Sequence, residues 1–416
     1  MPDTPDIPDS VRPHLALALV PGLGPKLTAA VLRTFGSADA ALRATAGQLL
    51  EIPHIGEKVA ASLAAALRTV DVEPELRLLE AHGVRPVPLG FPGYPAPLAG
   101  LSNPPPLLYF RGELTEAGAG AVAIVGSRSC TAYGKRVAEQ IARGLVRAGL
   151  TVVSGLARGI DGAAHRGALD AGGRTVAVLA GGLSEIYPPE HADLAAEIAA
   201  GRGCLVSETP MTVAPQPGMF PARNRIISGL SRAVVVIEAN AKSGALITAR
   251  HALEQGREVF AVPGNVDSPA SAGCLELLRH GATLVRSADD VLDDLKGIAT
   301  AEYPTTPASG ARPDPRDRRA TERGRDDGRE PLVGTNNQSE TKTEQGADAP
   351  RSPEPIPPPD LDPVQRRVFE LLASRRHGDE LSREAGLGVA ELSRVLMQLE
   401  MKRLVRRLPG NFYERR

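Results

Sequence analysis

The sequence predicts an α/β protein whose core is a parallel sheet with helices on both faces. Between residues 120 and 297, short apolar runs alternate with stretches of helix length, a pattern typical of parallel sheets. The runs are continuous in Val, Ile, Leu and Ala, as expected for strands buried on both faces. Helical periodicity before this region predicts an all-α N-terminal domain of the helix-hairpin-helix or SAM-like type. Helices followed by a hairpin at the other end predict a C-terminal winged helix.

Seven candidate strands define the sheet. They cover residues 121–126, 151–155, 175–180, 203–207, 233–238, 258–262 and 283–285. Ligands of open parallel sheets bind beyond the carboxyl ends of the strands. The segments that follow these strands are therefore expected to hold the binding site.

The N-terminal domain is expected to cover residues 1–84. Apolar residues recur there at three-to-four spacing through residues 15–32 and 59–79, the latter interrupted at Pro74. Two Gly-containing turns, at residues 21–26 and 52–58, lie between helices. They look like a tandem helix-hairpin-helix arrangement, whose turn amides can contact DNA phosphates. A compact helical bundle used for packing or protein contacts explains the pattern equally well.

The rest of the chain is expected to divide into three parts. The core covers residues 85–298 and opens with a Pro- and Gly-rich passage of turns and extended segments at 87–114. Residues 299–360 contain almost no large apolar residue, so burial cannot offset the entropy of ordering them, and a disordered linker is predicted.

A winged helix is predicted over residues 361–416. Its helices are expected at 364–372, 380–386 and 389–404, followed by a hairpin through 404–413. The segment 392–403 would be the recognition helix, and its Ser393, Arg394, Gln398 and Lys402 could read duplex DNA. Such modules also serve protein contacts, and this alternative stays open.

Composition excludes several classes of protein. The formal net charge is −1, which excludes a globally basic nucleic-acid binder but not a local basic patch. The three cysteines, Cys130, Cys204 and Cys274, are far apart, so neither a disulfide framework nor a metal site is expected. The acidic, Pro-rich start is no secretory signal, and no apolar run approaches the roughly 20 residues of a membrane span. A cytoplasmic protein without a membrane span is expected.

Phosphate ligands are predicted after the first two strands. The first strand ends in Gly126-Ser127-Arg128, and the helix expected at 133–148 would offer free N-terminal amides to a phosphate. Arg128 would add a charged contact. The second strand runs into Ser154-Gly155-Leu156-Ala157-Arg158-Gly159-Ile160-Asp161, where glycines let the backbone approach a ligand. Neither segment has the glycine spacing of a dinucleotide fingerprint, so NAD binding is not expected.

Asp161 and His165 are four residues apart and could meet on one helix face as a catalytic dyad. We favour another interpretation, in which Asp161 is the N-cap of a helix at 163–171 and His165 is structural or contacts a ligand. No catalytic residue, metal or cofactor is therefore assigned.

Two further motifs flank the strand at 233–238. Arg223, Asn224 and Arg225 precede it, between Pro221 and Gly229. We favour a phosphate contact over a solvated charge run, although arginines two residues apart point differently and only one is expected to reach the ligand.

Lys242, Ser243 and Gly244 follow the same strand and open a helix that includes Thr248. A point charge, a hydroxyl and free amides form a phosphate-binding arrangement. An ordinary capped helix start is the alternative, because the spacing of a P-loop and an acidic motif for Mg²⁺ are both absent.

Together these motifs predict a basic, Gly-lined groove at one edge of the sheet. Arg128, Arg158, Arg225 and Lys242 would surround it, as expected for a site that follows a nucleic-acid backbone. No aromatic residue adjoins Lys242 in the sequence. Base stacking is therefore not expected there, and contacts with phosphates should provide most of the affinity.

The ordered motifs resemble the DNA processing protein A family, also called DprA or Smf. The resemblance spans roughly residues 85–297. It rests on Gly126-Ser127-Arg128; the stretch 154–161 with His165; Gly181-Gly182 and Ile186-Tyr187-Pro188; Ser207-Glu208; the stretch 220–229; Lys242-Ser243-Gly244 with Thr248; and Pro263-Gly264-Asn265.

The resemblance implies an extended Rossmann-like fold for the core. It also implies that the Gly, Arg and Lys pocket binds single-stranded DNA, with Arg128 and Lys242 at positions expected to hold phosphates. It also implies a homodimer formed through the core, and loading of the recombinase RecA during natural transformation.

Two rival functions are weighed against this one. A nucleotide phosphoribohydrolase would need a P-G-G-x-G-T-x-x-E stretch where residues 238–246 stand, and the catalytic Glu is missing. A transcriptional regulator would read duplex DNA through the winged helix, but a lone module on a long tether reads DNA poorly.

Overall fold

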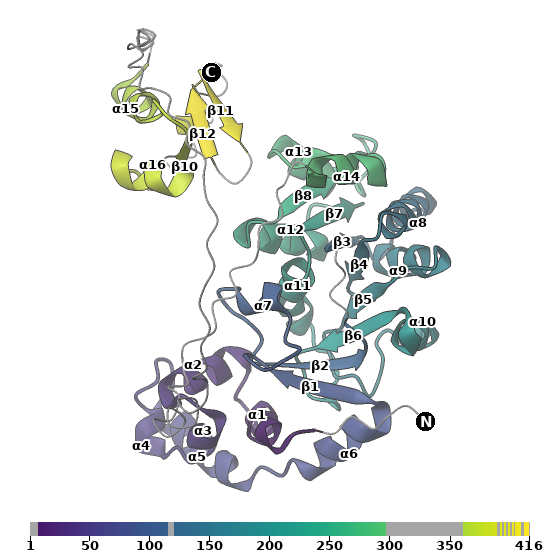
Figure 1. Ribbon diagram of the computed structural model, residues 1–416, viewed down its shortest axis with the longest axis vertical. Coiled ribbons are helices and arrows are strands. Elements are labelled where there is room, and N and C mark those ends of the chain that lie inside the picture. Colours follow the sequence, from purple (N-terminus) through teal and green to yellow (C-terminus); the bar gives the residue numbers. More distant parts are fainter. Residues whose placement is uncertain are drawn as a thin grey trace, which may run out of the picture. The chain divides into compact units, whose positions relative to one another are not determined.

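A computed structural model of the protein describes residues 7–114, 120–296 and 361–415, with gaps at 389–391, 393–394, 397, 400–401, 403 and 409–411. These residues form two compact units, one within Met1–Gly310 and one within Ala311–Arg416. Figure 1 shows the elements of each unit. The predicted linker at 299–360 lies outside the described residues, and the predicted domain limits stay predictions.

A nine-stranded sheet forms the centre of the first unit. Its strands are β1 (Val84–Pro88), β2 (Leu107–Gly112), β3 (Ala121–Gly126), β4 (Thr151–Ser154), β5 (Thr175–Val178), β6 (Gly203–Ser207), β7 (Ala233–Ile237), β8 (Glu258–Ala261) and β9 (Thr283–Leu284). They lie in the order β1-β2-β6-β5-β4-β3-β7-β8-β9. From β6 to β9 all neighbours are parallel, whereas β1 and β2 pair antiparallel. The connections run in opposite directions from β3, so the topological switch point lies between β3 and β7.

Helices cover both faces of this sheet (Figure 1). They are α7 (Ala96–Ala99), α8 (Ala132–Arg147), α9 (Ile160–Asp170), η2 (Pro189–His191), α10 (Ala192–Glu197), η3 (Ile198–Arg202), α11 (Met219–Gly229), α12 (Gly244–Glu254), α13 (Ala272–Arg279) and α14 (Ala288–Lys296). Alternate strand residues enter opposite cores, because side chains alternate across a strand. Val122 and Ile124 pack with α8, α9 and α14. Ala123 and Val125 pack with α11, α12 and α13.

Sequence patterns predicted the seven parallel strands to within a few residues but missed β1 and β2. The prolines and glycines of residues 87–114 predicted turns and extended segments there, and β1 itself contains Pro86 and Pro88. Proline removes a backbone donor, so strands that contain it lie at sheet edges. β1 occupies such an edge, where it pairs only with β2.

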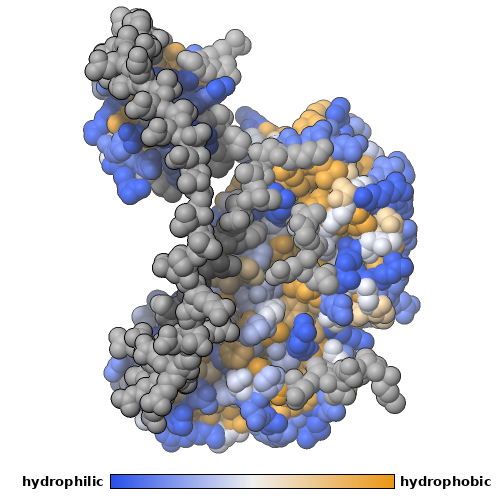
Figure 2. Space-filling view, viewed as in Figure 1, coloured by the Kyte–Doolittle hydropathy of each residue, from blue (hydrophilic) through white to orange (hydrophobic). Residues whose placement is uncertain are grey.

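On the face seen in Figure 2, polar side chains cover the outer surfaces of the helices around the sheet, and apolar side chains show between them.

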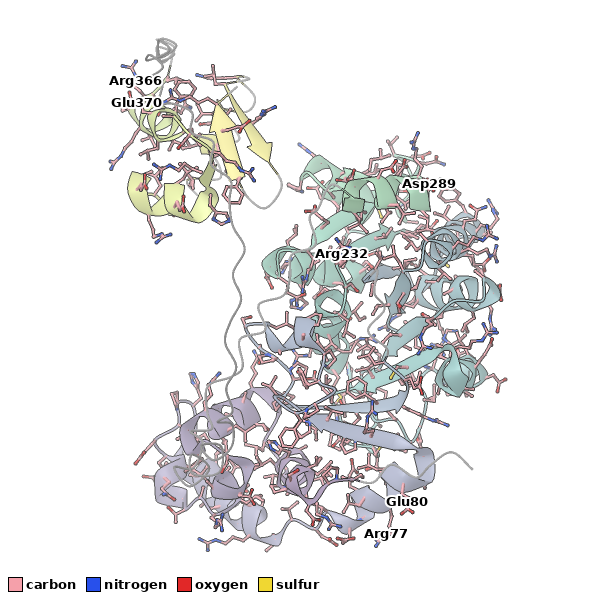
Figure 3. All side chains as sticks on the ribbon, in the orientation of Figure 1. Arg77, Glu80, Arg232, Asp289, Arg366 and Glu370 are labelled. Carbon is pink, nitrogen blue, oxygen red and sulfur yellow. The ribbon has the colours of Figure 1, made fainter. Side chains whose placement is uncertain are left out.

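The N-terminal region is helical, as predicted. Its elements are η1 (Asp9–Val11), α1 (Arg12–Leu19), α2 (Pro25–Phe35), α3 (Ala38–Leu42), α4 (Ala46–Leu49), α5 (Glu57–Thr69) and α6 (Glu73–His82). Pro74 stands in the first turn of α6, where proline is tolerated because that N–H has no intrahelical partner. Arg77 and Glu80 lie on the exposed side of α6 (Figure 3). No helix among the residues seen in the structure is long and apolar enough to cross a membrane.

The second unit has the predicted winged-helix layout. It contains α15 (Pro363–Leu371), β10 (Arg376–His377), α16 (Gly378–Ala385), β11 (Val405–Leu408) and β12 (Phe412–Arg415). Asp362 caps α15 by accepting bonds from the amides of Val364 and Gln365. The predicted recognition residues Ser393 and Arg394 fall outside the described residues. Gln398 accepts a hydrogen bond from Gln365 within the unit (2.8 Å), so its carbonyl oxygen is engaged inside the domain.

The predicted N-cap role of Asp161 was wrong, and the structure gives His165 a structural role. α9 begins at Ile160 after Gly159, so Asp161 lies inside its first turn. His165 is fully buried, and its Nδ1 lies 2.7 Å from Thr175 Oγ1. The Thr175 hydroxyl donates its own proton to Val152 O (2.8 Å), so His165 Nδ1 must be the donor to Thr175. His165 thus ties α9 to β5 as a neutral imidazole.

His165 should make stability depend on pH. Burial lowers the pKa of His165 from 6.5 to about 3. Its stabilising contribution is therefore fully present above pH 6.5 and is lost as the pH falls. Below pH 6.5 the imidazole of His165 is protonated in the unfolded chain but stays neutral in the folded chain. Lowering the pH from about 7.5 to about 5.5 should cost roughly 1 kcal/mol through this residue.

Urea unfolding followed by circular dichroism would measure this loss. His165→Gln cannot titrate and should lose less stability than the wild type over the same pH interval. An equal loss in both proteins would show that His165 is not the source of the pH dependence.

Candidate nucleic-acid interface

The carboxyl ends of the parallel strands surround a cavity of about 700 Å³ at the switch point. A narrow slot opens beside it toward the end of β5 and shares five lining residues with it, Arg128, Ala157, Tyr187, Pro215 and Phe220. We call the cavity and the slot together the edge groove. Of the predicted site residues, those that line it are Gly126, Ser127, Arg128, Gly155, Arg158, Arg223, Asn224, Ser243, Gly244 and Thr248.

The loop after β3 places Arg128 at the groove. Gly126 must be glycine, because a Cβ there would lie 1.9 Å from Ile237 O of the neighbouring strand. The Ser127 N–H donates to Glu238 O (2.7 Å), and Ser127 O accepts from Ile160 N (3.2 Å). Arg128 is exposed, and its guanidinium lies 4.8 Å from the centre of the Phe220 ring. The loop is thus fixed on both sides, and it presents a cation stacked on an aromatic face.

The start of α8 differs from the predicted phosphate site. Thr131 caps the helix by accepting from Gly134 N (3.2 Å). Glu238 in turn accepts from Thr131 N (2.7 Å) and from the Thr131 hydroxyl. A buried carboxylate of the protein therefore occupies the helix N-terminus where a phosphate was expected. Glu238 has φ +49°, a left-handed conformation that is strained for a residue with a Cβ.

The loop after β4 forms the floor of the groove. Asp161 accepts from Gly155 N (3.1 Å) and Ala157 N (3.3 Å), so it caps this loop rather than α9. Gly159 has φ +78°, and a Cβ there would lie 2.2 Å from Ser127 O. Ser154 is buried and donates to Ile124 O (2.6 Å). Ser154 and Gly159 therefore shape the loop without lining the groove.

The two arginines of α11 point in different directions, as predicted. Arg223, rather than Arg225, is the one that reaches the groove. Arg223 is buried and lines the cavity, where it donates to Gly155 O (2.8 Å) and to Val178 O. Burial lowers the pKa of Arg223 to about 10, and the Asp161 carboxylate opposes this shift. Asn224 beside it donates to Gly244 O (3.2 Å) and so links α11 to the start of α12.

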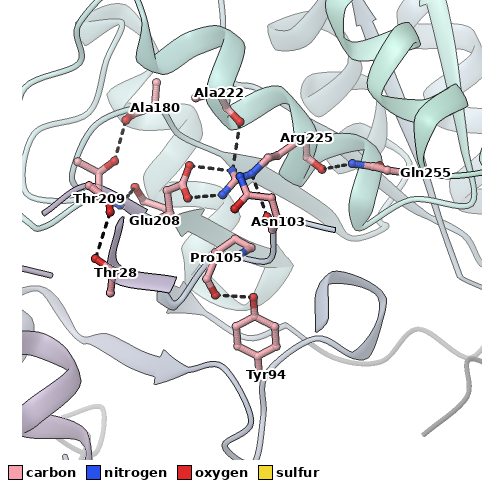
Figure 4. Close-up of polar contacts among 12 residues, drawn as sticks. Thr28, Tyr94, Asn103, Pro105, Ala180, Glu208, Thr209, Ala222, Arg225 and Gln255 are labelled. Carbon is pink, nitrogen blue, oxygen red and sulfur yellow. Dashed lines mark hydrogen bonds and ion pairs between the residues drawn. The ribbon is translucent and has the colours of Figure 1, made fainter. Parts of the chain in front are cut away.

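Arg225 does not line the groove, which corrects its predicted place there. Its guanidinium forms a bidentate ion pair with Glu208 (2.8 and 2.6 Å), and both side chains are only about one-tenth exposed (11% and 10%). It also donates to Asn103 O (3.2 Å), and its own carbonyl accepts from Gln255 (3.0 Å). Figure 4 shows this network, which joins α11 to the end of β6 and to the segment before β2.

The start of α12 is open to the cavity. Ser243 is its N-cap and accepts from Ala245 N (3.3 Å). Ser243, Gly244 and Thr248 line the cavity, whereas Lys242 lies exposed beside them and outside the lining. The Lys242 N–H donates to Asn240 Oδ1 (2.9 Å), which orders the turn. A helix N-terminus with a hydroxyl and a nearby cation suits an anion.

The groove is less basic than predicted. Arg158 lines the slot but pairs with Glu190, and this bond raises the pKa of Arg158. Glu185 lines the slot as well. Arg128 is therefore the exposed cation in the lining of the main cavity, and neutral N–H and O–H groups make up most of the polar lining in the part of the chain that the structure describes.

Sequence reasoning missed the aromatic side of the groove. Phe220 and Tyr187 line both the cavity and the slot, and their ring centres are 5.9 Å apart. Phe220 opens the motif that contains Arg223 and Arg225, so it could have been proposed from that neighbourhood. Tyr187 comes from the distant loop after β5, and only the fold brings it to Phe220.

The first N-terminal hairpin, Pro21–Pro25, lines a separate cavity of about 490 Å³ together with Thr209 and Met219 of the core. Among the residues that the structure describes, no group of three or more His, Cys, Asp and Glu side chains could hold a metal ion.

The sequence matches three family models. They are "DNA recombination-mediator protein A" over residues 87–296, a SAM-like helix-hairpin-helix tandem over residues 15–69, and the DprA winged helix domain over residues 352–411.

Similar proteins agree with these matches. Protein Smf of Synechocystis is 35% identical over 410 residues, which is 97% of this chain and 98% of that protein. DNA processing protein DprA of Bacillus subtilis is 44% identical over 240 residues, 56% of this chain and 80% of that protein. The X-ray structure of DNA processing protein A from Streptococcus pneumoniae superimposes with a TM-score of 0.59 at 34% identity, covering 70% of this chain and 99% of that one. The chain therefore belongs to the DprA/Smf family of DNA processing proteins and recombination mediators.

Proposed function

We propose that the protein binds single-stranded DNA in the edge groove without regard to base sequence, and loads RecA onto it in natural transformation and homologous recombination. One observation carries the first half of this proposal. A cavity of about 700 Å³ at the switch point brings together an exposed guanidinium, many neutral donors and an aromatic ring. The family description as a recombination mediator supports the second half.

Phosphates have two places to bind. Arg128 is one, and the start of α12, with Ser243, Gly244 and the neighbouring Lys242, is the other. These lie on either side of the switch point, because one follows β3 and the other follows β7. Neutral amides and hydroxyls make up most of the polar lining of this cavity, together with the buried Arg223 and Asp161.

The Phe220 ring is the place where bases would stack. It is half-buried, it lines both parts of the groove, and it lies between Arg128 and Tyr187. Aromatic faces accept any base, because every base has a π-face. A duplex hides these faces, and a single strand offers them, so this ring favours the single strand.

We also infer that the protein acts in the cytoplasm as a homodimer and not as an enzyme. Leu284, on the edge strand β9, is a large apolar side chain exposed at one end of the sheet, where a second copy could pack. Two copies would bind one strand more tightly through effective concentration. The winged helix remains available for duplex DNA or protein contacts.

Removing either cation should weaken single-strand binding and its salt dependence. Arg128→Ala and Lys242→Ala should each lower the affinity for a labelled dT oligonucleotide. Each should also flatten the slope of log K against log salt by about 0.7, the contribution of one phosphate on a single strand. Fluorescence anisotropy across a salt series measures both quantities.

Arg77→Ala is the matched control, because Arg77 is an exposed cation on α6 that lines none of the described cavities. Duplex DNA of the same length should bind more weakly than the single strand. If Arg128→Ala and Lys242→Ala bind like the wild type, the edge groove is not the DNA site.

The Phe220 ring should contribute affinity that does not depend on salt. Phe220→Leu should weaken binding of the dT oligonucleotide roughly tenfold, because loss of one stacked base costs about 1–3 kcal/mol. The slope against salt should stay as in the wild type. Phe220→Tyr keeps an aromatic face and should bind normally, and weakening by both substitutions would argue against stacking.

RecA loading should depend on the same groove. On single-stranded DNA covered by single-stranded DNA-binding protein, the wild type should shorten the lag before RecA hydrolyses ATP. Arg128→Ala should not shorten the lag, because it cannot hold the strand. If the wild type leaves the lag unchanged although it binds DNA, the loading function is wrong and the binding function stands.

A further inference from the structure

The carboxyl edge of the sheet continues past the edge groove to the end of β8. Beyond the lining residue Ser129, the chain enters α8, and its second residue is Tyr133. The Tyr133 hydroxyl donates to Pro263 O (3.4 Å), in the loop that follows β8. Tyr133 therefore extends from a segment that follows β3, past the end of β7, to the end of β8.

Tyr133 is unusual in its exposure. Of the Phe and Tyr side chains that the structure describes, only Tyr133 and Tyr187 are exposed, at 45% and 44%. Both lie at the carboxyl edge, and Tyr187 lines the groove. Val266, in the loop that bonds Tyr133, is 88% exposed. An exposed aromatic ring, bonded to a loop with an exposed apolar side chain, thus lies beyond the groove on the side of β8, away from Tyr187 at the end of β5.

Contacts of its neighbours with Glu238 fix the position of Tyr133. The preceding Thr131 holds Glu238 through two hydrogen bonds, and the following Gly134 lies so close that a Cβ would come within 2.4 Å of the Glu238 carboxyl carbon. A ring that is already held in place loses little conformational entropy when a ligand stacks on it.

Cations accompany the ring. Arg136 is one helical turn farther along α8 and is exposed. Lys242 is exposed in the turn after β7, and β7 lies between β3 and β8, the strands that precede Ser129 and Pro263. An exposed ring accompanied by cations suits a single strand, in which bases stack and phosphates pair with charge.

We propose that Tyr133 stacks an unpaired base outside the cavity, so that one DNA strand runs from the end of β5, across the ends of β4, β3 and β7, to the end of β8. This proposal rests on the proposed function, because it extends the same site. The ligand at Tyr133 is a nucleobase of any identity. The strand occupies Tyr133 only when it is longer than the groove itself.

The test compares dT oligonucleotides of about 4 and about 20 nucleotides. Single-strand sites span roughly 4 to 16 nucleotides, so the first matches the smallest sites and the second exceeds the largest. Tyr133→Leu keeps an apolar side chain without a ring and should weaken binding of the long oligonucleotide roughly tenfold while leaving the short one unchanged. Tyr133→Phe should bind both like the wild type. The fluorescence of 2-aminopurine in a long oligonucleotide should be quenched when the wild type or Tyr133→Phe binds. Tyr133→Leu should quench it less. Circular dichroism and thermal melting establish that the variants fold.

Several results would overturn the proposal. Unchanged long-oligonucleotide affinity in Tyr133→Leu would do so, and so would equal weakening at both lengths, which would indicate a disturbed groove. Weakening in Tyr133→Phe would assign the effect to the hydroxyl bond with Pro263. A change in self-association by sedimentation without a change in DNA binding would make this surface a protein contact.

Arg128→Ala distinguishes DNA binding in the edge groove from base stacking on Tyr133. If it weakens both oligonucleotides while Tyr133→Leu weakens neither, the proposed function survives and only the role of Tyr133 fails. If the wild type binds neither oligonucleotide, the proposed function fails, and the role of Tyr133 fails with it.

Discussion

The edge groove depends on the hydrogen bonds of Glu238. Its backbone carbonyl holds Ser127, and its carboxylate holds the amide and hydroxyl of Thr131. The residue does this from a left-handed conformation just past β7. One strained residue thus fixes the loop that carries Arg128, fills the N-terminus of α8 and directs the chain toward α12. Because the α8 terminus is already satisfied, the phosphate site that we propose lies at the open start of α12.

Two buried arginines arrange the rest of the site. Arg223 lies near Asp161 and bonds the carbonyls of Gly155 and Val178, so it holds the ends of β4 and β5 together. Arg225 and Glu208 do the same for α11 and β6. Breaking such a pair leaves an uncompensated charge, so these residues are fixed by folding rather than by ligand binding. Of the four arginines predicted to contact DNA, Arg223 and Arg225 are buried and bond to groups of the protein, and Arg158 pairs with Glu190.

This use of charge explains what could be predicted from the sequence. The parallel strands were predictable because apolar runs of Val, Ile and Ala have few other uses, and the site was predictable because parallel strands share a carboxyl edge. The partners of Arg225, Asp161 and His165 were not, because Glu208, Gly155 and Thr175 come close only in the fold. Tyr187 was noted only as part of a family motif, and its contact with Phe220 could not be predicted for the same reason. β1 was missed because its prolines disfavour a strand. The DNA-binding roles of the lining residues stay predictions.

The prolines of β1 have a consequence for how the molecule meets its neighbours. β1 is the last strand on its side, and an open strand edge invites another chain to add to the sheet. Pro86 and Pro88 remove two of the amides that such an added strand would need. Addition of another strand on this side of the sheet is therefore disfavoured. This protection from edge-to-edge aggregation matters most where many copies of a protein are concentrated together.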